Sequence, residues 1–322
     1  MDVAAPFIGV WAVWSIAGWC AVSMRSGILR KGVVLAMVVT ACSLVFWLWE
    51  HSAWLRGLAV IPVLLLLGKS WMIGVRRIPW LDEPVKPVPF ALWCLVLPEG
   101  RRSADPMVRA SIRQRAAREA LRALAKGLVL ALLLALNDRA DLATMRPIQL
   151  VWTAVVFYLC FSMLRDVLGV VWGMLGVEVC DVFDSPLIAR NPREFWGARW
   201  NLWFTRTVHR LVFEPMRSRY SAVVASAVVF ALSALIHEAI VVVGLAEFDG
   251  RMILFFAIQG MGTVLYSTLK ARGYAPWPRP LAVATHFCWM WLTVAWFLDP
   301  LDAFTGVSTW GLDEMQQFVG LD

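Results

Sequence analysis

Charged side chains are scarce in this chain of 322 residues, since Asp, Glu, Lys and Arg make up 16% of it while 60% of the residues are hydrophobic. A typical soluble domain has about a quarter of its residues charged, because it must cover its surface with polar groups. The composition therefore excludes an ordinary soluble protein and indicates that lipid is the main solvent.

The chain also lacks the residue patterns of several common sites. Its six cysteines form no Cys-x-x-Cys pair and no other metal-ligand spacing, so no metal site is expected. A Gly-x-Ser-x-Gly motif, the nucleophile turn of α/β-hydrolases, does not occur. The net charge of +7 follows from basic loops on one side of a membrane, so no nucleic-acid partner is predicted from it.

Long apolar runs are what the sequence does contain. Several approach the ~20 residues that a helix needs to cross the hydrocarbon layer, and spanning segments must pair their backbone groups internally. We predict an all-α, polytopic transmembrane helical bundle of about eight spans, forming a single domain over residues 1–322. The predicted spans are 7–24, 32–49, 54–75, 127–137, 147–164, 221–246, 252–269 and 280–298.

Two further segments are predicted to lie in or on the membrane without crossing it. Residues 166–180 are apolar but short, and only Arg165 and Asp166 separate them from the preceding span, which indicates a re-entrant or tilted helix. Residues 105–126 form a basic amphipathic helix that we expect at the membrane interface, an ordinary charged connector being the alternative.

The basic loops also predict the orientation in the membrane. Lys and Arg concentrate in alternate connections, chiefly residues 76–126 and 165–219, whereas the tail from Asp299 has five acidic residues and no Lys or Arg. Because cytoplasmic loops carry the excess of Lys and Arg, both termini are predicted outside. The short, loop-poor chain suggests a bacterial inner membrane, with residues 165–219 on its cytoplasmic side.

His237 is the histidine that lies deepest in a predicted span. It follows Ser221 by sixteen residues and precedes Ala246 by nine, which places it ~24 Å and ~14 Å from the two ends of the helix. An ionisable group at this depth is costly and usually faces a cavity, where it marks a site. Ser233, one turn earlier, is placed to orient the imidazole, and Glu238 follows directly. The alternative is that His237 and Glu238 only join neighbouring helices by hydrogen bonds.

Another polar segment, residues 183–201, leads into an aromatic helix. Asn191 is placed to cap a helix that begins at Pro192, with Glu194 completing a capping box. Aromatic and arginine residues then recur at helical spacing: Phe195, Trp196, Arg199, Trp200, Trp203 and Phe204. On physical grounds alone, an interfacial helix is the favoured interpretation.

The motif Phe-Trp-Gly-x-Arg-Trp-Asn at 195–201, followed by Ser-x-x-x-His-Glu at 233–238, resembles the wax synthase-like branch of the membrane-bound O-acyltransferase family. The similarity covers about 183–246, and the amino-terminal half matches only in hydropathy. In that family an asparagine and a histidine are the functional positions, which fall here on Asn201 and His237. The resemblance implies a multispanning enzyme that moves an acyl group from coenzyme A to a hydroxyl.

The chemistry of these side chains agrees with the resemblance. A neutral His237 is a suitable base for the attacking hydroxyl. Asn201 either donates a hydrogen bond to the thioester carbonyl, an interaction that typically contributes ~2.7–4 kcal/mol, or positions the acceptor. Ser233 and Glu238 are supporting residues. The residues expected to bind substrate or coenzyme A, through basic or aromatic side chains, are Trp196, Arg199, Trp200, Trp203 and Arg206.

The expected partners are acyl-coenzyme A as co-substrate, a lipophilic hydroxyl acceptor and membrane lipids, with no tightly bound cofactor. A long-chain alcohol, giving a wax-type ester, is the favoured acceptor, and acetyl or acyl transfer to a terpenoid, sterol or sugar hydroxyl is the alternative. Two other classes stay open: a proton-coupled transporter or channel that uses the His237–Glu238 pair, and a haem protein ligated by His237 and His286.

Overall fold

The helical class is confirmed over the part of the chain that the computed structural model describes, residues 4–24, 27–75, 90, 93–94, 101–102, 105–140, 145–275 and 277–310. Within these ranges the strands form a single antiparallel ladder, in which β1 (Arg101–Arg102) pairs with β2 (Val177–Glu178). All other regular structure there is helical, as expected for a protein whose backbone must pair internally in lipid.

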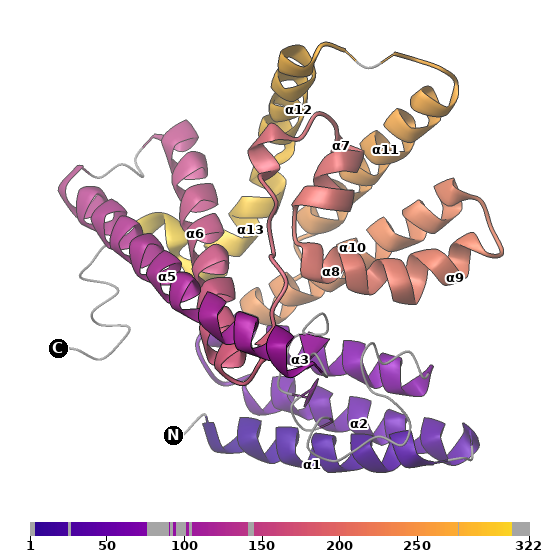
Figure 1. Ribbon diagram of the computed structural model, residues 1–322. Coiled ribbons are helices and arrows are strands. Elements are labelled where there is room, and N and C mark those ends of the chain that lie inside the picture. The colour runs from indigo at the N-terminus through magenta and orange to yellow at the C-terminus, as the bar shows by residue number, and fades with distance from the viewer. Residues whose placement is uncertain are drawn as a thin grey trace.

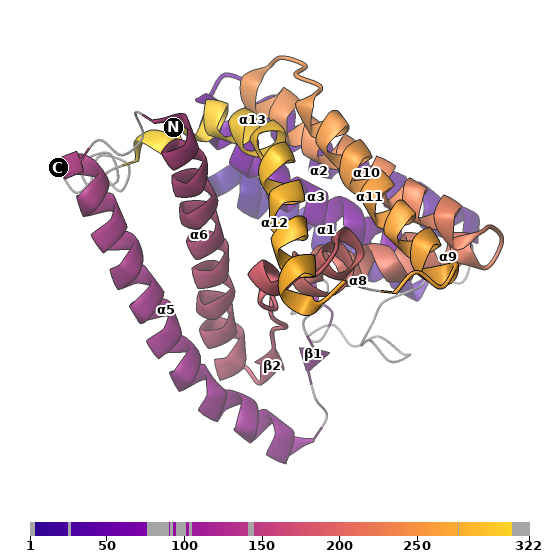
Figure 2. The same ribbon diagram turned by 90° about the horizontal axis from the view of Figure 1, so that it is seen from above.

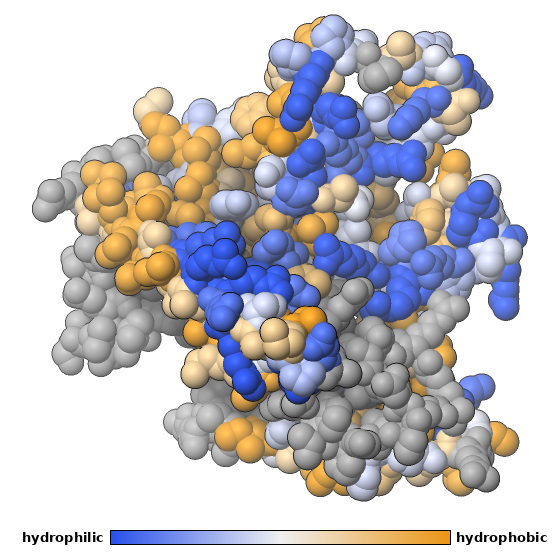
Figure 3. Space-filling view, in the orientation of Figure 1, coloured by the Kyte–Doolittle hydropathy of each residue, from blue (hydrophilic) through white to orange (hydrophobic). Residues whose placement is uncertain are grey.

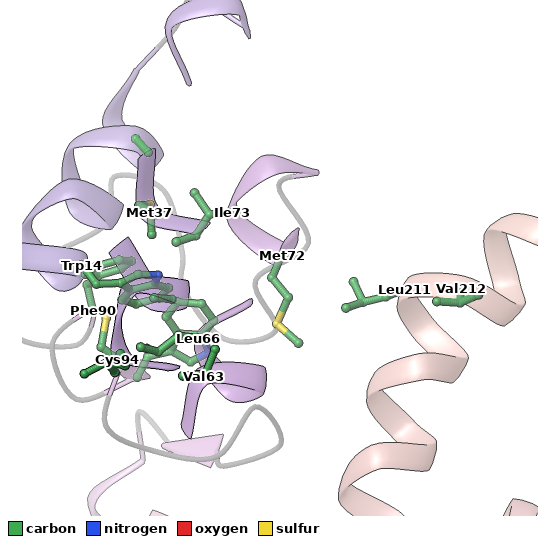
Figure 4. Packing of buried hydrophobic residues seen from close by; sticks show 14 residues of the cluster. Trp14, Met37, Val63, Leu66, Met72, Ile73, Phe90, Cys94, Leu211 and Val212 are labelled. Carbon is green, nitrogen blue, oxygen red and sulfur yellow. The ribbon is translucent and has the colours of Figure 1, made fainter. Parts of the chain in front are cut away.

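Three amino-terminal helices lie side by side and form one layer of the molecule (Figure 1): α1 (Ala4–Ser23), α2 (Gly27–Trp47) and α3 (Ala53–Gly74). Trp14 is fully buried between them, and its Nε1 donates to Ser70 Oγ at 3.0 Å. Figure 4 shows Leu211 and Val212, from η4 (His209–Phe213), beyond Met72 in the same cluster. The layer therefore anchors a segment close to the sequence motif.

Two long antiparallel helices, α5 (Pro106–Ala140) and α6 (Arg146–Met174), extend from one side of the molecule (Figure 2). The predicted division of α5 into an interfacial helix and a span at 127–137 is wrong, because the helix is continuous. The predicted end of a span at residue 164 is also wrong, since α6 continues through Arg165 and Asp166 to Met174. Arg165 and Asp166 stay in the helix because charged side chains of neighbouring segments neutralise them.

The charges that neutralise them come from α5 and from the loop after β2. Arg165 Nη1 lies 2.8 Å from Glu119 Oε1, and Arg165 Nε lies 2.9 Å from Asp181 Oδ1. Lys126 Nζ pairs with Asp166 Oδ2. Buried charges are tolerated when they are paired in this way. Both of these α6 residues are buried, with 8% and 2% of their surface exposed.

The other long antiparallel pair is α10 (Ala222–Leu245) and α11 (Arg251–Ala271), and α10 also packs against α3. The last helices, α12 (Arg279–Thr293) and α13 (Ala295–Thr305), meet at a bend of 47°. The predicted single helix over 280–298 is therefore broken. The bend turns the buried face of α13, with Phe297 and Leu301, toward α10 and α11.

Five of the described helical segments are long and apolar enough to cross a membrane: 27–47, 55–74, 146–174, 222–245 and 251–271. The bent pair α12–α13 makes a sixth if it is one span, and residues 8–23 form a shorter apolar helix. The protein is thus a polytopic membrane protein, and the count of eight spans stays a prediction.

The motif segment links α6 to α10 through short helical pieces. They are η2 (Pro186–Ile188), α7 (Pro192–Glu194), the π-helix η3 (Phe195–Arg199), α8 (Leu202–Val208), the π-helix η4 and α9 (Glu214–Arg217). The single aromatic helix predicted here is wrong, because Asn201 has φ 44° and ψ 57°, a left-handed conformation that interrupts the helix. Hydrophilic side chains gather on the face of the molecule over α7–α9 (Figure 3).

Candidate active site

Asn191 and Glu194 fix the start of the motif segment. Asn191 Oδ1 accepts from the backbone N–H of Glu194 at 2.8 Å, which confirms that Asn191 caps the helix. The capping box differs from the prediction, since the Glu194 side chain accepts from the N–H of Arg190, one residue before the cap. The Glu194 carboxylate accepts from the backbone N–H of Arg190 and from the Arg190 and Arg199 side chains, at 2.7–3.1 Å. Burial raises the pKa of Glu194, but these hydrogen bonds outweigh it and lower the pKa to about 2. The carboxylate therefore stays ionised and holds the turn.

A cavity of about 620 Å³ lies between this segment, α10 and α11. On α10 it follows one helical stripe from Ala222 to His237, ~22 Å at 1.5 Å per residue. On α11, which runs the opposite way, it extends from Lys270 to Phe256. Ala222 and Lys270 are thus at the same end, which we call the mouth, and His237 and Phe256 are at the other end.

His237 presents one nitrogen as an acceptor. Its Nδ1 lies 2.8 Å from the backbone oxygen of Ser233, and because a carbonyl only accepts, Nδ1 carries the proton. In the neutral imidazole, Nε2 is then the nitrogen that can accept a proton. The imidazole ring packs against Phe256 and Phe297, with ring centroids 4.4 Å and 5.7 Å away. Ser233 thus orients His237, through its backbone oxygen, while the Ser233 hydroxyl donates to Val229.

Asn201 lies in the wall of the same cavity. Its Oδ1 caps α8 by accepting from the backbone N–H of Phe204 at 3.3 Å. Asparagine tolerates the left-handed backbone of this position better than most residues, which is one reason for its presence here. Since its oxygen faces the helix, the amide NH₂ is the end of the side chain that can donate to a bound molecule.

Five of the nine residues singled out from the sequence line this cavity: Trp196, Trp200, Asn201, Ser233 and His237. The other four, Arg199, Trp203, Arg206 and Glu238, do not line the cavity. Arg199 binds Glu194 and the Asp184 backbone oxygen, Trp203 Nε1 donates to the Cys180 oxygen at 2.7 Å, and Arg206 is exposed.

Glu238, the fourth, points to the α10–α11 turn. Its Oε1 accepts from the backbone N–H groups of Asp249 and Gly250, at 2.9 Å and 2.7 Å. The side chains of His237 and Glu238 therefore point to different surroundings, because successive side chains on a helix are about 100° apart. Glu238 holds the turn that fixes α11 against α10.

Gln259 is a residue that the sequence argument missed. It is fully buried on α11, and its Oε1 accepts from Trp196 Nε1 and from Trp289 Nε1, at 3.1 Å each. Its Nε2 donates to Thr293 Oγ1 at 2.8 Å. Gln259 thus fixes Trp196 in the cavity wall. An amide in the middle of an apolar span was the signal that could have identified it.

Other lining residues carried weaker signals. Arg193 and Lys270 line the cavity as cations, but single basic residues near a span end are common. Phe256 and Phe297 line it as apolar residues of apolar helices, which no pattern distinguishes from core. Among the described residues, no cluster of His, Cys, Asp or Glu could hold a metal ion.

Comparison with known proteins identifies the motif region. Residues 179–258 match the sequence model of the membrane bound O-acyl transferase family. The chain is 26% identical over 173 residues to acyl-CoA–sterol O-acyltransferase 1 of Arabidopsis thaliana, covering 50% of each protein. It is 25% identical over 151 residues to the long-chain-alcohol O-fatty-acyltransferase of Simmondsia chinensis, covering 44% of this chain and 43% of the relative. The matches span about half the length of these relatives.

Proposed function

Because residues 179–258 place this chain in the membrane-bound O-acyltransferase family, on its wax synthase-like branch, we propose that the protein transfers an acyl group from acyl-coenzyme A to a hydroxyl acceptor. The favoured acceptor is a long-chain alcohol, which would give a wax-type ester; a terpenoid, sterol or sugar hydroxyl is the alternative. The observation that carries the proposal is His237, which lines the cavity with its Nδ1 bound to the Ser233 backbone oxygen, so that Nε2 is the accepting nitrogen of the neutral ring.

His237 supplies the proton transfers of this reaction. As the acceptor hydroxyl attacks the thioester carbonyl, Nε2 takes its proton, so the alkoxide never forms free. The tetrahedral intermediate then expels the coenzyme A thiolate, which receives the proton from the imidazolium. The ester and free coenzyme A are the products, and no covalent acyl-enzyme is needed.

Asn201 assists the same step. Its NH₂ donates to the carbonyl oxygen of the thioester as negative charge develops there, or holds the acceptor. Mutational losses of such donors are typically ~2.7–4 kcal/mol. Trp196 and Trp200 contact the bound donor in the cavity wall. Arg199 and Trp203 are outside the cavity lining and hold the motif segment through Glu194 and the Cys180 oxygen. Arg206 is exposed and is available to a phosphate group of coenzyme A.

The remaining assignments concern the whole chain. We propose one integral membrane domain over 1–322 with its motif core at about 183–246, no tightly bound cofactor, and acyl-coenzyme A reaching the motif from the cytoplasm of a bacterial inner membrane. A pyrophosphate-bearing donor suits the exposed cations of the cavity lining, Arg193 and Lys270. The chain binds membrane lipids and no nucleic acid.

The experiment compares His237→Ala and Asn201→Ala with the wild type in purified membranes or detergent. We expect His237→Ala to lose release of free coenzyme A in the presence of hexadecanol, by at least ~10²-fold, and Asn201→Ala by ~10²–10³-fold. His286→Ala is the matched control, because His286 is a buried histidine outside the cavity lining. Full activity in both site variants, with unchanged thermal stability, would remove the proposal.

The transporter alternative requires His237 and Glu238 to lie on one path for protons or ions. His237 lines the cavity, whereas Glu238 binds the backbone of the α10–α11 turn, so the geometry favours the transferase. Proton-coupled flux in liposomes without coenzyme A release would reverse this preference. A haem would be evident from the visible absorption of the purified protein.

A further inference from the structure

The cavity places the reaction centre far from its mouth. At the mouth, Lys270 is an exposed cation that can meet phosphate groups, and Arg193 is a second exposed cation in the cavity lining. His237 lies ~22 Å of helix away from Ala222 at that end. If the nucleotide of acyl-coenzyme A stays at the mouth, its pantetheine arm fills the length of the cavity and brings the thioester to the imidazole. The acyl group must then fit beyond the sulfur.

Beyond the imidazole the cavity ends on two aromatic rings, Phe256 and Phe297, which we call the floor. Both rings pack against His237 at tilted angles, and their centroids lie 6.1 Å from one another with an edge-to-face angle of 79°. They are 2% and 9% exposed. Behind the floor the apolar core is closely filled by fully or largely buried residues: Val241, Met252, Phe255, Leu298, Leu301 and Phe304.

Protein cores are close-packed, so a floor backed by such a cluster does not admit a long chain without moving side chains. The volume of about 620 Å³ is within the ~300–1,000 Å³ of cavities that hold drug-sized ligands. It suits a pantetheine arm with a small acyl group. A long-chain acyl group would need a further pocket beyond His237, and core residues occupy that position.

We propose that Phe256 and Phe297 are specificity-determining residues that restrict the acyl donor to short chains, in the range of acetyl to butyryl. This inference rests on the proposed transferase function and deepens it, because it concerns the donor. A long-chain alcohol stays the acceptor, and the product is then a short-chain ester of that alcohol in place of a wax-type ester. The inference predicts that substitutions in the floor change the length of the acyl chain that the enzyme accepts. Substitutions in the part of the cavity that holds the pantetheine arm should leave that length unchanged.

The test measures kcat/KM for acetyl-, butyryl-, octanoyl- and palmitoyl-coenzyme A with hexadecanol as the common acceptor, using the full chain. We expect the wild type to prefer butyryl over palmitoyl by at least about tenfold, since each methylene that gains or loses an apolar contact changes binding about fourfold. Phe297→Ala and Phe256→Ala should raise the palmitoyl-to-butyryl ratio by at least about tenfold.

Phe304→Ala is the matched control for Phe297→Ala. Both residues are on α13 and in the same apolar cluster, but Phe304 packs against Gly57 and Gly244 and does not line the cavity. It should lower thermal stability without changing the ratio. If either alanine variant does not fold, the leucine variant at the same position keeps the core filled and should shift the ratio in the same direction.

Two outcomes would overturn the inference alone: a wild type that uses palmitoyl as well as butyryl, or floor variants whose ratio equals that of the wild type. A ratio that shifts equally in Phe304→Ala would also overturn it, because the effect would then be general loosening. If a folded wild type released no coenzyme A from any donor, the transferase function itself would be contradicted.

Discussion

The two long antiparallel helix pairs, α5–α6 and α10–α11, both enclose ionisable side chains, yet they use them differently. Between α5 and α6, Arg165 and Asp166 are matched by Glu119 and Lys126, and the space left there is about 30 Å³. Between α10 and α11, His237 has only a backbone oxygen as partner and borders about 620 Å³ of open cavity. An ionisable residue inside a helix pair can therefore serve either structure or function. The open space beside His237, which Arg165 and Asp166 lack, indicates a functional role.

Arg165→Ala should have the largest effect on stability, because it breaks the charge network of the α5–α6 pair. Asp166 and Glu119 would lose their common partner, and removal of one member of a buried ion pair typically costs ~3–5 kcal/mol. Thermal unfolding in detergent measures the change. Activity per folded molecule should stay well above that of His237→Ala, because Arg165 and its charged partners do not line the cavity.

Arg115→Ala is the control for that variant. Arg115 pairs with Glu178 at 3.0 Å, but both side chains are more than 40% exposed. Exposed pairs typically contribute ~0–1 kcal/mol, so the melting temperature should hardly change. An equal loss of stability in the two variants would mean that burial of the network has no special importance, and the comparison between the helix pairs would fail.

The same contrast explains what the sequence could and could not predict. Composition and apolar runs predict a helical membrane protein, because backbone pairing in lipid leaves few alternatives. The end of α6 could not be predicted, since the partners that keep Arg165 in the helix come from α5, dozens of residues away. His237 was identifiable as an ionisable residue deep in a predicted span, whereas Asn201 was identified through the resemblance of its motif to a known family. Phe297 was not, because only the bend before α13 brings it to the cavity.

Gln259→Leu should have an intermediate effect on stability, and it tests whether a buried polar residue of the α10–α11 pair also affects the cavity. The change leaves the indole N–H groups of Trp196 and Trp289 without their acceptor, at a cost of ~1–3 kcal/mol. Because Trp196 lines the cavity, KM for the acyl donor should rise more than kcat falls. Gln149→Leu, which removes an amide on α6 that contacts Arg146, should change neither constant. Stability loss with unchanged KM would show that Gln259 serves packing alone.

Glu238→Gln should have the smallest effect, and it separates the two neighbours on α10. Glutamine keeps an oxygen that can accept from the Asp249 and Gly250 N–H groups, so only the charge contribution is lost, ~1 kcal/mol. Glu238→Ala removes the acceptor as well and should destabilise more. Coenzyme A release by the glutamine variant should stay close to that of the wild type, because the carboxylate faces the turn. If Glu238→Gln instead lost as much activity as His237→Ala, while melting at the wild-type temperature, the carboxylate would act in the reaction, and the separation of a structural side from a reactive side of α10 would be wrong.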